Sequence, residues 1–594
     1  MKVLLVAVNA KYIHTNLAVY SLRAYAKKYS DYIELTEYTI NQSEENILKE
    51  IYKKNADIIA FSCYIWNIDI ITRVVVELKK VLPKAKIWFG GPEVSYNAEK
   101  CLKSHTNLDG IMIGEGEQTF LELMEYYVNC TQELNQIPGL AFKNSAKLYP
   151  PAETPSTQEE LGDADITITP QRRPLSLDII PFPYEEVESF HHKIIYYESS
   201  RGCPFSCSYC LSSIDKRVRH RDTGLVKKEL KIFLDHKVSQ VKFVDRTFNC
   251  NKKHAMEIWQ FVKEQDNGIT NFHFEIAADL LDDEEIKLLA TLRPGQVQLE
   301  IGVQSTNPDT ISVIHRKTDF AKISNNVRSI QAGHNIHQHL DLIAGLPLEN
   351  YYAFSKSFDD VYRLKPDQFQ LGFLKVLKGA LMEEETKVYG IVHQNTPPYE
   401  VLMTNHLPYS ELLRIKGVCE MVEMYYNSGQ YEYSIPFLEH FFETPMQLYQ
   451  ELSDYYDRNK LDLLAHSRVR RYEILLDFYK EMILNTKKQE EQDFVNVFKE
   501  ILVLDLYLRE DMKSRPAFAQ KPVKYKNIHE IYDKLETDRN DIHIEHFTYD
   551  IINSCKAGQA IKKDNIIVFD YSKRDPLNKA AKIMVISNVG ENAT

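Results

Sequence analysis

Two stretches of the chain alternate short apolar runs with segments of helical spacing, and this alternation limits the possible folds more than any other feature. The first stretch covers residues 1–130 and the second covers residues 186–390. Strands that alternate with helices form βαβ units and therefore a parallel sheet. Ligands of such sheets bind at the carboxyl ends of the strands. The sequence therefore predicts an α/β protein with two parallel sheets and ligand sites at their strand ends.

The first stretch predicts a doubly wound, Rossmann-like domain. Its expected strands end in small or polar residues, which suits a ligand site; they are Lys2–Val8, Ile58–Cys63, Lys86–Phe89 and Gly110–Ile113. Residues 131–185 are polar and rich in proline, which is typical of a linker. We expect one small hairpin in this linker, around Gly139–Leu148.

The second stretch predicts a partial TIM-type barrel. Six apolar runs are separated by helical segments, which fits a (β/α)6 arrangement. The six expected strands are Ile194–Glu198, Gln240–Val244, Asn271–Ile276, Gln296–Ile301, Gln338–Ile343 and Gln368–Val376.

Residues 391–594 lose this alternation and predict a mainly helical C-terminal domain. The expected helices lie in four amphipathic segments, Ser410–Tyr426, Thr444–Arg458, Arg468–Leu484 and Glu491–Lys513. Two apolar runs near the end, Asn565–Tyr571 and Lys582–Ile586, predict strands. We expect this domain to close over the barrel mouth and to help select a substrate.

Composition narrows the possible partners. The formal charge is −12, from 72 basic and 84 acidic residues, so the chain has no global basic surface for a phosphate backbone. A local basic run, Lys521, Lys524 and Lys526 beside Tyr525, can contact RNA, although a solvated charged surface is the favoured interpretation. No apolar run reaches the ~18 residues of a membrane span, and the N-terminus has no cleavage-site pattern. We therefore expect a cytoplasmic protein with no membrane partner.

Three of the nine cysteines lie within eight residues. They belong to the segment Arg201-Gly202-Cys203-Pro204-Phe205-Ser206-Cys207-Ser208-Tyr209-Cys210, with Cys-x3-Cys-x2-Cys spacing, directly after an expected strand. An odd number of cysteines spread over a long chain argues against a disulfide framework. Thiolates suit iron–sulfur clusters or zinc, and a zinc site would need a fourth ligand such as His220. The spacing favours a cluster and leaves zinc as the alternative.

This segment resembles the signature of the radical S-adenosylmethionine (SAM) superfamily, Cys-x3-Cys-x-aromatic-Cys. Cys203, Cys207 and Cys210 match the three ligands of a [4Fe–4S] cluster, and Tyr209 stands in the aromatic position. The resemblance implies that SAM chelates the open iron through its amino and carboxylate groups. It also implies that one electron from the cluster cleaves SAM to a 5′-deoxyadenosyl radical.

Four later strand ends are similar to further SAM-binding elements of that superfamily. The resemblance assigns contacts with SAM to eight polar side chains, Asp245, Thr247, Asn249, Glu275, Glu300, Gln304, Ser305 and Asp341. Taken singly, each of these is more often a solvated or capping residue, so the assignment depends on their concordant order. The nearby His315-Arg316-Lys317 is interpreted as a surface helix end.

The N-terminal domain resembles the cobalamin-binding domain of one branch of the superfamily. The residues expected to contact cobalamin lie at the strand ends, where glycine lets a flat macrocycle approach the backbone. They are Tyr12, His14, Asn16, Ser62, Tyr64, Trp66, Gly90, Gly91, Glu93, Gly114, Glu115, Glu117 and Thr119. The Asp-x-His-x-x-Gly motif that supplies a cobalt ligand in many such domains does not occur. The lower side of cobalt is therefore expected to face one of six groups, Lys11, Tyr12, His14, Tyr64, Trp66 or water. For His14, a structural role in the loop is at least as well supported as a role as cobalt ligand.

The resemblance implies an enzyme with a [4Fe–4S] cluster, SAM and cobalamin. Its usual reaction is methyl transfer to an unactivated carbon through a 5′-deoxyadenosyl radical and methylcobalamin. The alternatives are rearrangement, cyclisation or transfer-RNA nucleoside modification on the same scaffold, and, more remotely, a sensor without turnover. The expected partners are an unidentified small molecule or transfer RNA as substrate, and an electron donor such as flavodoxin or ferredoxin.

Overall fold

The structure is a computed structural model of the chain, and two compact units make it up. It describes residues 1–144, 166–185, 187–190, 192–482, 491–520 and 541–586. The first unit consists of Met1–Leu299, Ser312–Thr318 and Phe373–Thr404. The second unit consists of Glu300–Ile311, Asp319–Gly372 and Asn405–Thr594.

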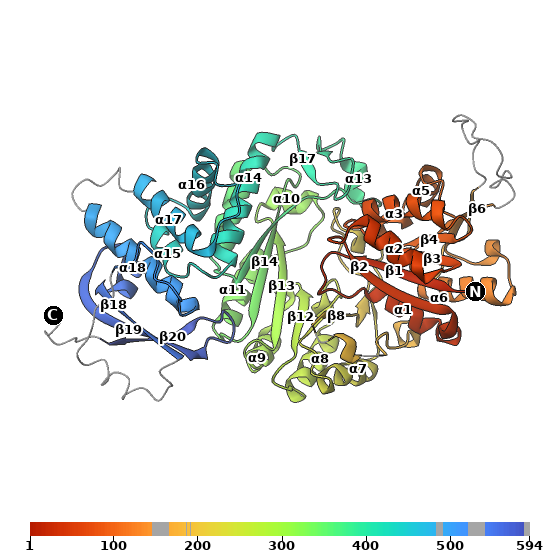
Figure 1. Cartoon of the computed structure of the whole chain (residues 1–594), viewed down its shortest axis with the longest axis horizontal. Helices are drawn as coiled ribbons and strands as arrows, with labels where there is room; N and C mark the ends of the chain where they lie inside the picture. The colour runs from red at the N-terminus through yellow and green to blue at the C-terminus, as the bar shows by residue number, and fades with distance from the viewer. Residues whose placement is uncertain (145–165, 186, 191, 483–490, 521–540, 587–594) are drawn as a thin grey trace. The chain divides into compact units, whose positions relative to one another are not determined.

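A seven-stranded sheet begins the first unit, in the order β2-β1-β3-β4-β5-β6-β7. Strands β1 to β5 are parallel, and helices cover both faces, with α1 and α6 on one and α2 and α3 on the other (Figure 1). The strands are β1 Val3–Asn9, β2 Ile33–Thr39, β3 Ile58–Ser62, β4 Lys86–Gly90, β5 Gly110–Met112, β6 Leu140–Lys143 and β7 Ile166–Ile168. The helices are α1 Leu17–Tyr25, α2 Glu44–Lys54, α3 Ile68–Val81, α4 Pro92–Ser95, α5 Ala98–Ser104 and α6 Glu117–Asn129. The doubly wound fold predicted from the sequence is confirmed.

The order of these strands creates a ligand site. Because β2 and β3 lie on opposite sides of β1, the chain changes direction across the sheet between β1 and β3. Parallel α/β sheets bind ligands at such a switch point, outside the carboxyl ends of the strands. The loops that follow Asn9 and Ser62 therefore form the expected binding edge of this sheet.

The predicted linker is partly wrong. Strand β6 pairs antiparallel with β5, and β7 pairs antiparallel with β6, so two short segments of 131–185 belong to the sheet. Of the hairpin expected around Gly139–Leu148, only the part before residue 145 is described, and it forms β6, which pairs with β5 and β7; the rest lies outside the described residues. These strands of four and three residues lie among prolines, where a sequence pattern of such length gives no clear periodicity. Residues 145–165 lie outside the described part of the chain.

The second sheet has six strands in the order β15-β14-β13-β12-β11-β8, which confirms the predicted (β/α)6 arrangement. The pairs β8–β11 and β11–β12 are parallel. The strands are β8 Ile194–Tyr197, β11 Gln240–Phe243, β12 Asn271–Ile276, β13 Val297–Gln304, β14 His337–Ala344 and β15 Gln368–Phe373. Between them lie α7 Thr223–Asp235, α8 Lys252–Glu264, α9 Asp283–Leu289, α10 Pro308–Val313, α11 Phe320–Gln331 and α12 Tyr351–Tyr362. A two-residue pair, β9 Ser200–Arg201 with β10 Arg219–His220, follows β8.

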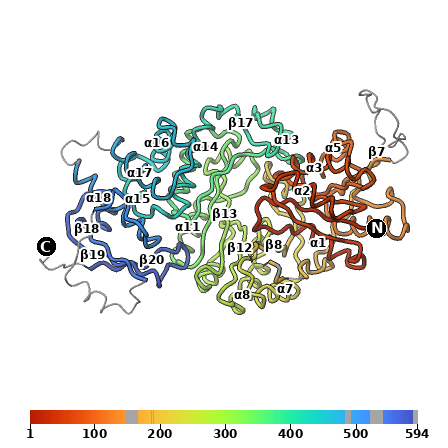
Figure 2. The backbone as a smooth tube through the Cα atoms, viewed as in Figure 1, coloured from red at the N-terminus to blue at the C-terminus, as the bar shows by residue number. Residues whose placement is uncertain are grey.

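Helices dominate the C-terminal region, as predicted. They are α14 Tyr409–Val422, α15 Ser434–Glu439, α16 Pro445–Arg458, α17 Arg468–Met482, α18 Glu491–Arg509 and α20 Ile551–Ala557. A small antiparallel sheet in the order β18-β19-β20 packs against α18 (Figure 2); its strands are β18 Ile542–Tyr549, β19 Lys562–Arg574 and β20 Ala581–Ile586. Strand β18 was not expected from the sequence.

Helix α14 continues into a π-helical turn, Glu423–Asn427, that lies along strand β15. The side-chain amide of Asn427 donates to the carbonyl oxygen of Phe369 at 2.8 Å and accepts from its N–H at 2.9 Å. The thiol of Cys419 lies 3.5 Å from the carbonyl oxygen of Leu371. Side chains of one helix thus occupy the backbone groups of the last strand of the sheet.

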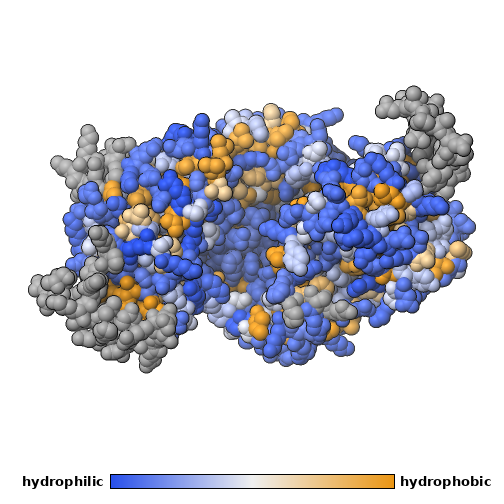
Figure 3. All heavy atoms as spheres, in the orientation of Figure 1, coloured by the Kyte–Doolittle hydropathy of each residue, from blue (hydrophilic) through white to orange (hydrophobic). Residues whose placement is uncertain are grey.

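Polar residues dominate the face of the protein in Figure 3, where apolar residues form small, separated areas. Within the described part of the chain, every helix falls short of the length and apolar character that a membrane crossing requires.

Candidate active site

The cysteine loop follows the pair of short strands β9 and β10. Cys203 and Cys207 are buried, and Cys210 is half-buried. The N–H of Cys203 donates to the carbonyl oxygen of Asp215, and the N–H of Cys210 donates to that of Cys207 at 3.2 Å. Gly202 has φ +102°, and a Cβ there would lie 2.4 Å from the carbonyl oxygen of Arg217. The loop therefore turns tightly at a position that only glycine can occupy.

Two other segments hold the same loop through the backbone of Ser208. Its N–H donates to the carbonyl oxygen of Ile314 at 3.0 Å, and its carbonyl oxygen accepts from the N–H of Met382 at 2.8 Å. Met382 lies on the short helix α13, Leu381–Glu385. The cysteine loop is thus fixed by chain segments more than a hundred residues away.

Arg316 contacts the cysteine loop directly, so its interpretation as part of a surface helix end is wrong. Its guanidinium lies 3.3 Å from the hydroxyl of Tyr209 and 3.9 Å from Sγ of Cys207. Burial raises the pKa of the Cys207 thiol, and the positive charge of Arg316 opposes that rise. The guanidinium therefore favours the thiolate that a metal cluster needs.

The cysteine loop fits the three-thiolate set of a [4Fe–4S] cluster. Within the described ranges, no three His, Cys, Asp or Glu side chains surround one metal position. A cubane cluster binds each thiolate through a different iron, so its ligands need not meet at one point. His220, the fourth ligand of the zinc alternative, instead lies against His254, with ring centroids 4.7 Å apart.

The polar residues that follow β11 contact the cysteine loop and the residues just before it. Asp245 is fully buried, and its carboxylate accepts from the N–H and hydroxyl of Ser199 and from the hydroxyl of Ser200 at 2.6–3.0 Å. Burial raises its pKa to about 6. The hydroxyl of Thr247 lies 3.6 Å from Sγ of Cys203. The contacts of Asp245 and Thr247 with SAM stay predictions; in the structure Asp245 bonds the residues just before the loop, and Thr247 lies beside Cys203.

The structure ties other predicted SAM ligands to neighbouring protein groups. Asn249 exchanges two hydrogen bonds of 2.9 Å with the backbone of Ala277. Glu275 lies 3.9 Å from the guanidinium of Arg246. Asp341 lies 2.9 Å from Nε2 of His339.

The end of β13 carries the remaining predicted SAM ligands. Glu300 lies in the strand, and Gln304 ends it with φ +71°. Ser305 is buried and donates to Glu349 at 2.5 Å. Glu349 is 1% exposed, and burial raises its pKa to about 8. Sequence reasoning missed Glu349, because the contact that defines it joins residues 44 positions apart.

The loops after β1 and β3 bring several predicted cobalamin contacts together. Asn16 caps helix α1 and donates to the hydroxyl of Ser62 at 3.0 Å. The rings of Tyr64 and Trp66 stack with centroids 4.3 Å apart, and Trp66 is 43% exposed. Asn67, which sequence reasoning did not assign, is fully buried and donates to the carbonyl oxygens of both β1 and β3. A stacked aromatic pair, of which Trp66 is exposed, therefore stands at the switch point of the sheet.

The first loop places its two aromatic candidates differently. Tyr12 is 73% exposed, and the ammonium of Lys193 lies 5.7 Å from its ring centre. Nδ1 of His14 lies 2.7 Å from the hydroxyl of Tyr196. Burial, with help from nearby lysines, lowers the pKa of His14. One ring nitrogen of His14 is thus engaged within the protein.

The loop after β4 depends on glycine and on one buried carboxylate. Gly90 ends the strand, and Gly91 has φ +110°, with a built Cβ 2.5 Å from the carbonyl oxygen of Cys63. Glu93 is buried and accepts from Lys378 and from the hydroxyl of Tyr399, both at 2.5 Å. The predicted role of Glu93 toward cobalamin is therefore accompanied by a structural one.

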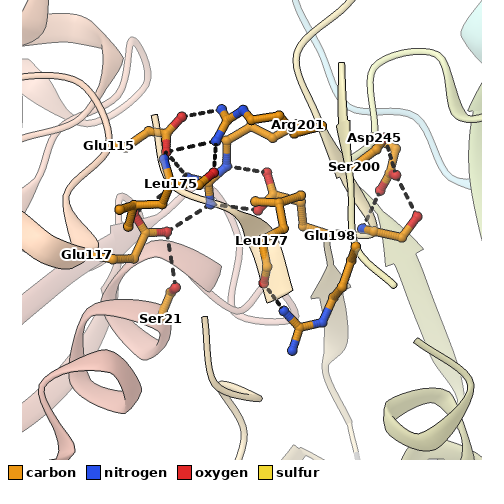
Figure 4. Close-up of polar contacts among 12 residues, drawn as sticks. Ser21, Glu115, Glu117, Leu175, Leu177, Glu198, Ser200, Arg201 and Asp245 are labelled. Carbon is orange, nitrogen blue, oxygen red and sulfur yellow. Dashed lines mark hydrogen bonds and ion pairs between the residues drawn. The ribbon is translucent and has the colours of Figure 1, made fainter. Parts of the chain in front are cut away.

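The loop after β5 contacts the short strand β9, which precedes the cysteine loop. Gly114 has φ +76°. Glu115 and Glu117 form ion pairs with Arg201, with N–O distances of 3.1 and 2.8 Å (Figure 4). Thr119 is fully buried and accepts from Arg172 rather than facing solvent. Two carboxylates predicted to contact cobalamin thus reach toward the cysteine loop. The sequence motif included Arg201, but its spacing assigned it no partner.

Family models match three consecutive regions. The B12-binding domain matches residues 3–124, the radical SAM superfamily matches residues 197–361, and a protein family of unknown function, DUF4080, matches residues 387–569. The first match covers strands β1 to β5, and the second covers strands β11 to β14 together with the cysteine loop.

Three curated relatives share part of this arrangement. An uncharacterized methyltransferase of Pyrococcus horikoshii is 27% identical over 40% of this chain and 49% of the relative. The cobalamin-dependent radical SAM methyltransferase TokK of Streptomyces tokunonensis is 23% identical over 67% of this chain and 61% of the relative. An anaerobic magnesium-protoporphyrin IX monomethyl ester cyclase of Synechocystis is 26% identical over 45% of this chain and 51% of the relative. The chain spans about half the length of the curated relatives it matches.

Among solved structures, the cobalamin-dependent S-adenosylmethionine radical enzyme OxsB with aqua-cobalamin bound matches with a TM-score of 0.52. The match has 14% identity and covers 93% of this chain and 83% of that one, so it shows a shared fold. The cysteine loop and its sheet define a radical SAM protein. The N-terminal match adds a B12-binding domain, and the two domains together imply a [4Fe–4S] cluster, SAM and cobalamin as cofactors.

Proposed function

We propose that this chain is a cobalamin-dependent radical SAM enzyme that transfers a methyl group to an unactivated carbon atom. The supporting observation is that one compact unit contains both the buried cysteine loop and the B12-type sheet, joined through Arg201. When bound, the cofactors supply the electron that cleaves SAM and a cobalt that carries a methyl group. The names of two relatives as methyltransferases agree with this outcome.

The chain's own residues would do three things for this reaction. Cys203, Cys207 and Cys210 would hold the cluster, and the polar strand ends after β11 to β14 would orient SAM. The aromatic pair of Tyr64 and Trp66 would face the corrin at the switch point. The burial of the cysteines excludes water from the site where a radical forms.

The first experiment tests the cluster. Anaerobic protein reconstituted with iron and sulfide should bind about four irons, as one cubane requires. Changing the three loop cysteines together to Ala should abolish the cluster absorbance and all SAM cleavage. The matched control is Cys130→Ala, which removes an exposed cysteine and should change neither. Zinc in place of iron after anaerobic purification would contradict the proposal.

The second experiment tests the reaction. Untargeted mass spectrometry of a deletion strain would search metabolites and nucleosides for an accumulated precursor. The isolated precursor, incubated with the reconstituted, cobalamin-loaded enzyme, SAM and a reductant, should gain one CH2 unit. A product of unchanged composition or with lost hydrogen would instead support rearrangement or cyclisation, the second candidate, which the cyclase relative favours. Absence of any SAM cleavage would leave only a sensor role.

The remaining parts of the proposal concern partners and place. We propose that residues 391–594 help select the substrate, since most of them lie in the DUF4080 match, residues 387–569, which is separate from both cofactor domains. A flavodoxin or ferredoxin in the cytoplasm would supply the electron. The basic run at residues 521–526, considered for transfer RNA, lies outside the described residues.

A further inference from the structure

Arg201 stands between the cysteine loop and three carboxylates. It lies two residues before Cys203, and its guanidinium pairs with Glu198 at 2.7 Å, Glu117 at 2.8 Å and Glu115 at 3.1 Å (Figure 4). Its side chain is 22% exposed. A planar guanidinium with five donors can serve several carboxylates at once, which a lysine ammonium does with less geometric control. The residue is therefore held from both the barrel strand and the B12-binding domain.

The strand opposite Arg201 repeats the same contact. Arg219 is the register partner of Arg201 in the β9–β10 pair, and its guanidinium pairs with Glu115 and donates to the carbonyl oxygen of Leu175. The cysteine loop connects these two strands. Both ends of the loop are thus attached to one acidic residue of the neighbouring domain.

The carboxylate end of this network belongs to the expected cobalamin edge. Glu115 and Glu117 flank Gly116 between β5 and the start of α6. Glu117 is 5% exposed and also accepts from the hydroxyl of Ser21. Burial favours the neutral form of Glu117, yet Arg201 outweighs that effect and lowers the pKa of this carboxyl. The pair is therefore charged, and neither partner can move without leaving a buried charge behind.

From this geometry we infer that Arg201 is a positioning residue that couples cobalamin binding to SAM binding. The inference rests on the proposed function. Bound cobalamin would fix the loop after β5. Through its ion pairs with Glu115 and Glu117, Arg201 would then fix the position of the cysteine loop, which carries the cluster and therefore SAM. Coupling of this kind is reciprocal, so each ligand tightens the binding of the other by the same factor.

The test measures this factor in the full-length, reconstituted protein. Equilibrium dialysis with labelled SAM, without reductant, gives the Kd of SAM in the absence and in the presence of saturating hydroxocobalamin. For the wild type we expect cobalamin to tighten SAM binding by about fivefold or more. In Arg201→Gln the ratio of the two Kd values should fall to about one, and Arg201→Lys should restore part of it, because the charge is kept.

A matched control and the iron content distinguish a loss of coupling between cobalamin and SAM from a loss of the fold or of the cluster. Arg293→Gln removes another half-buried arginine–carboxylate pair, with Asp266, that does not touch the B12-binding domain, and it should keep the wild-type ratio. All variants should bind about four irons and show wild-type circular dichroism. If Arg201→Gln disturbs the fold, Glu117→Gln tests the same pair from the other side and should also lower the ratio.

The outcomes distinguish this inference from the proposed function. A wild-type ratio of one, or a ratio in Arg201→Gln and Glu117→Gln equal to that of the wild type, would overturn the inference while SAM and cobalamin still bind. Failure of the wild type to bind SAM or cobalamin at all would instead overturn the proposed function.

Discussion

Gly91 should be the most sensitive backbone position of the B12-binding domain. Its φ of +110° and ψ of 174° lie in a region that is essentially restricted to glycine, and a residue with a side chain there costs about 1–3 kcal/mol. A Cβ would also lie 2.5 Å from the carbonyl oxygen of Cys63, so the backbone must shift, which costs roughly another 1–3 kcal/mol. Gly91→Ala should therefore destabilise this edge of the sheet by about 2–6 kcal/mol.

Two other glycines provide matched controls for the two parts of this estimate. Gly114→Ala adds a Cβ with no heavy atom within 4 Å at a φ of +76°, so it should show backbone strain alone, about 1–2 kcal/mol. Gly90→Ala has no positive φ and its Cβ would meet Met112 at an ordinary 3.5 Å, so it should change stability by less than about 1 kcal/mol.

Hydrogen exchange followed by mass spectrometry measures these effects locally, which suits a chain of several domains. The amides of residues 58–95 report the opening of β3 and β4, where the N–H of Cys63 donates to Gly90 at 2.7 Å. Gly91→Ala should accelerate exchange there at least about 30-fold and should lose cobalamin on purification. Exchange in Gly91→Ala as slow as in Gly90→Ala would refute the reasoning.

Three further predictions concern the cluster, cobalt and a buried acid. Arg316→Gln should lower the midpoint potential of the cluster by about 60 mV, because it removes a cation beside Cys207. This shift corresponds to a tenfold change in the equilibrium constant of a one-electron reduction. An unchanged potential in a redox titration followed by electron paramagnetic resonance would contradict this. Cob(II)alamin bound to the protein should show no axial-nitrogen splitting, and His14→Ala should leave its spectrum unchanged, because the imidazole is held by Tyr196; splitting that disappears in the variant would show the opposite. Since burial raises the pKa of Glu349 from 4.5 to about 8, its stabilising neutral form is fully present below pH 4.5 and is lost as the pH rises through about 8. Glu349→Gln should remove up to about 5 kcal/mol of this pH-dependent loss of stability. The thermal unfolding midpoints at about pH 5.5 and about pH 8.5 should therefore differ less in the variant than in the wild type. The same difference in both proteins would rule the explanation out.

The sequence predicted the six barrel strands because buried apolar residues recur along each of them, as in β13, where every second residue is buried. Strand β2 was missed because Ile33–Thr39 lies at the edge of its sheet, where only its first and sixth residues are buried. Strands β6 and β7 were missed because they are short and pair antiparallel after a proline-rich connection. Periodicity therefore missed one edge strand and two strands of only three or four residues.

The predictable part of the site was the part encoded by local spacing. Three cysteines within eight residues identify the cluster loop without any knowledge of the fold. The partners of Arg201 and Arg316 lie 84 and 109 positions away, and no spacing rule connects such residues. Asp245, Thr247 and Asn249 follow β11 as the sequence placed them, whereas Glu300 lies inside β13, which continues to Gln304 beyond its predicted end at Ile301. The hydrogen bonds of these side chains within the protein depend on the packing of neighbouring strands.

The contacts of Asn427 and Cys419 with β15 determine how this chain can be divided. A six-stranded barrel of this kind does not close on itself, and its last strand would present free N–H and C=O groups as a template for another chain. The amide of Asn427 saturates those of Phe369. A shortened protein that ends before α14 would therefore be expected to self-associate through β15. In the full-length chain, Asn427 and Cys419 cover part of this edge, and a protein without α14 would need another segment to cover it.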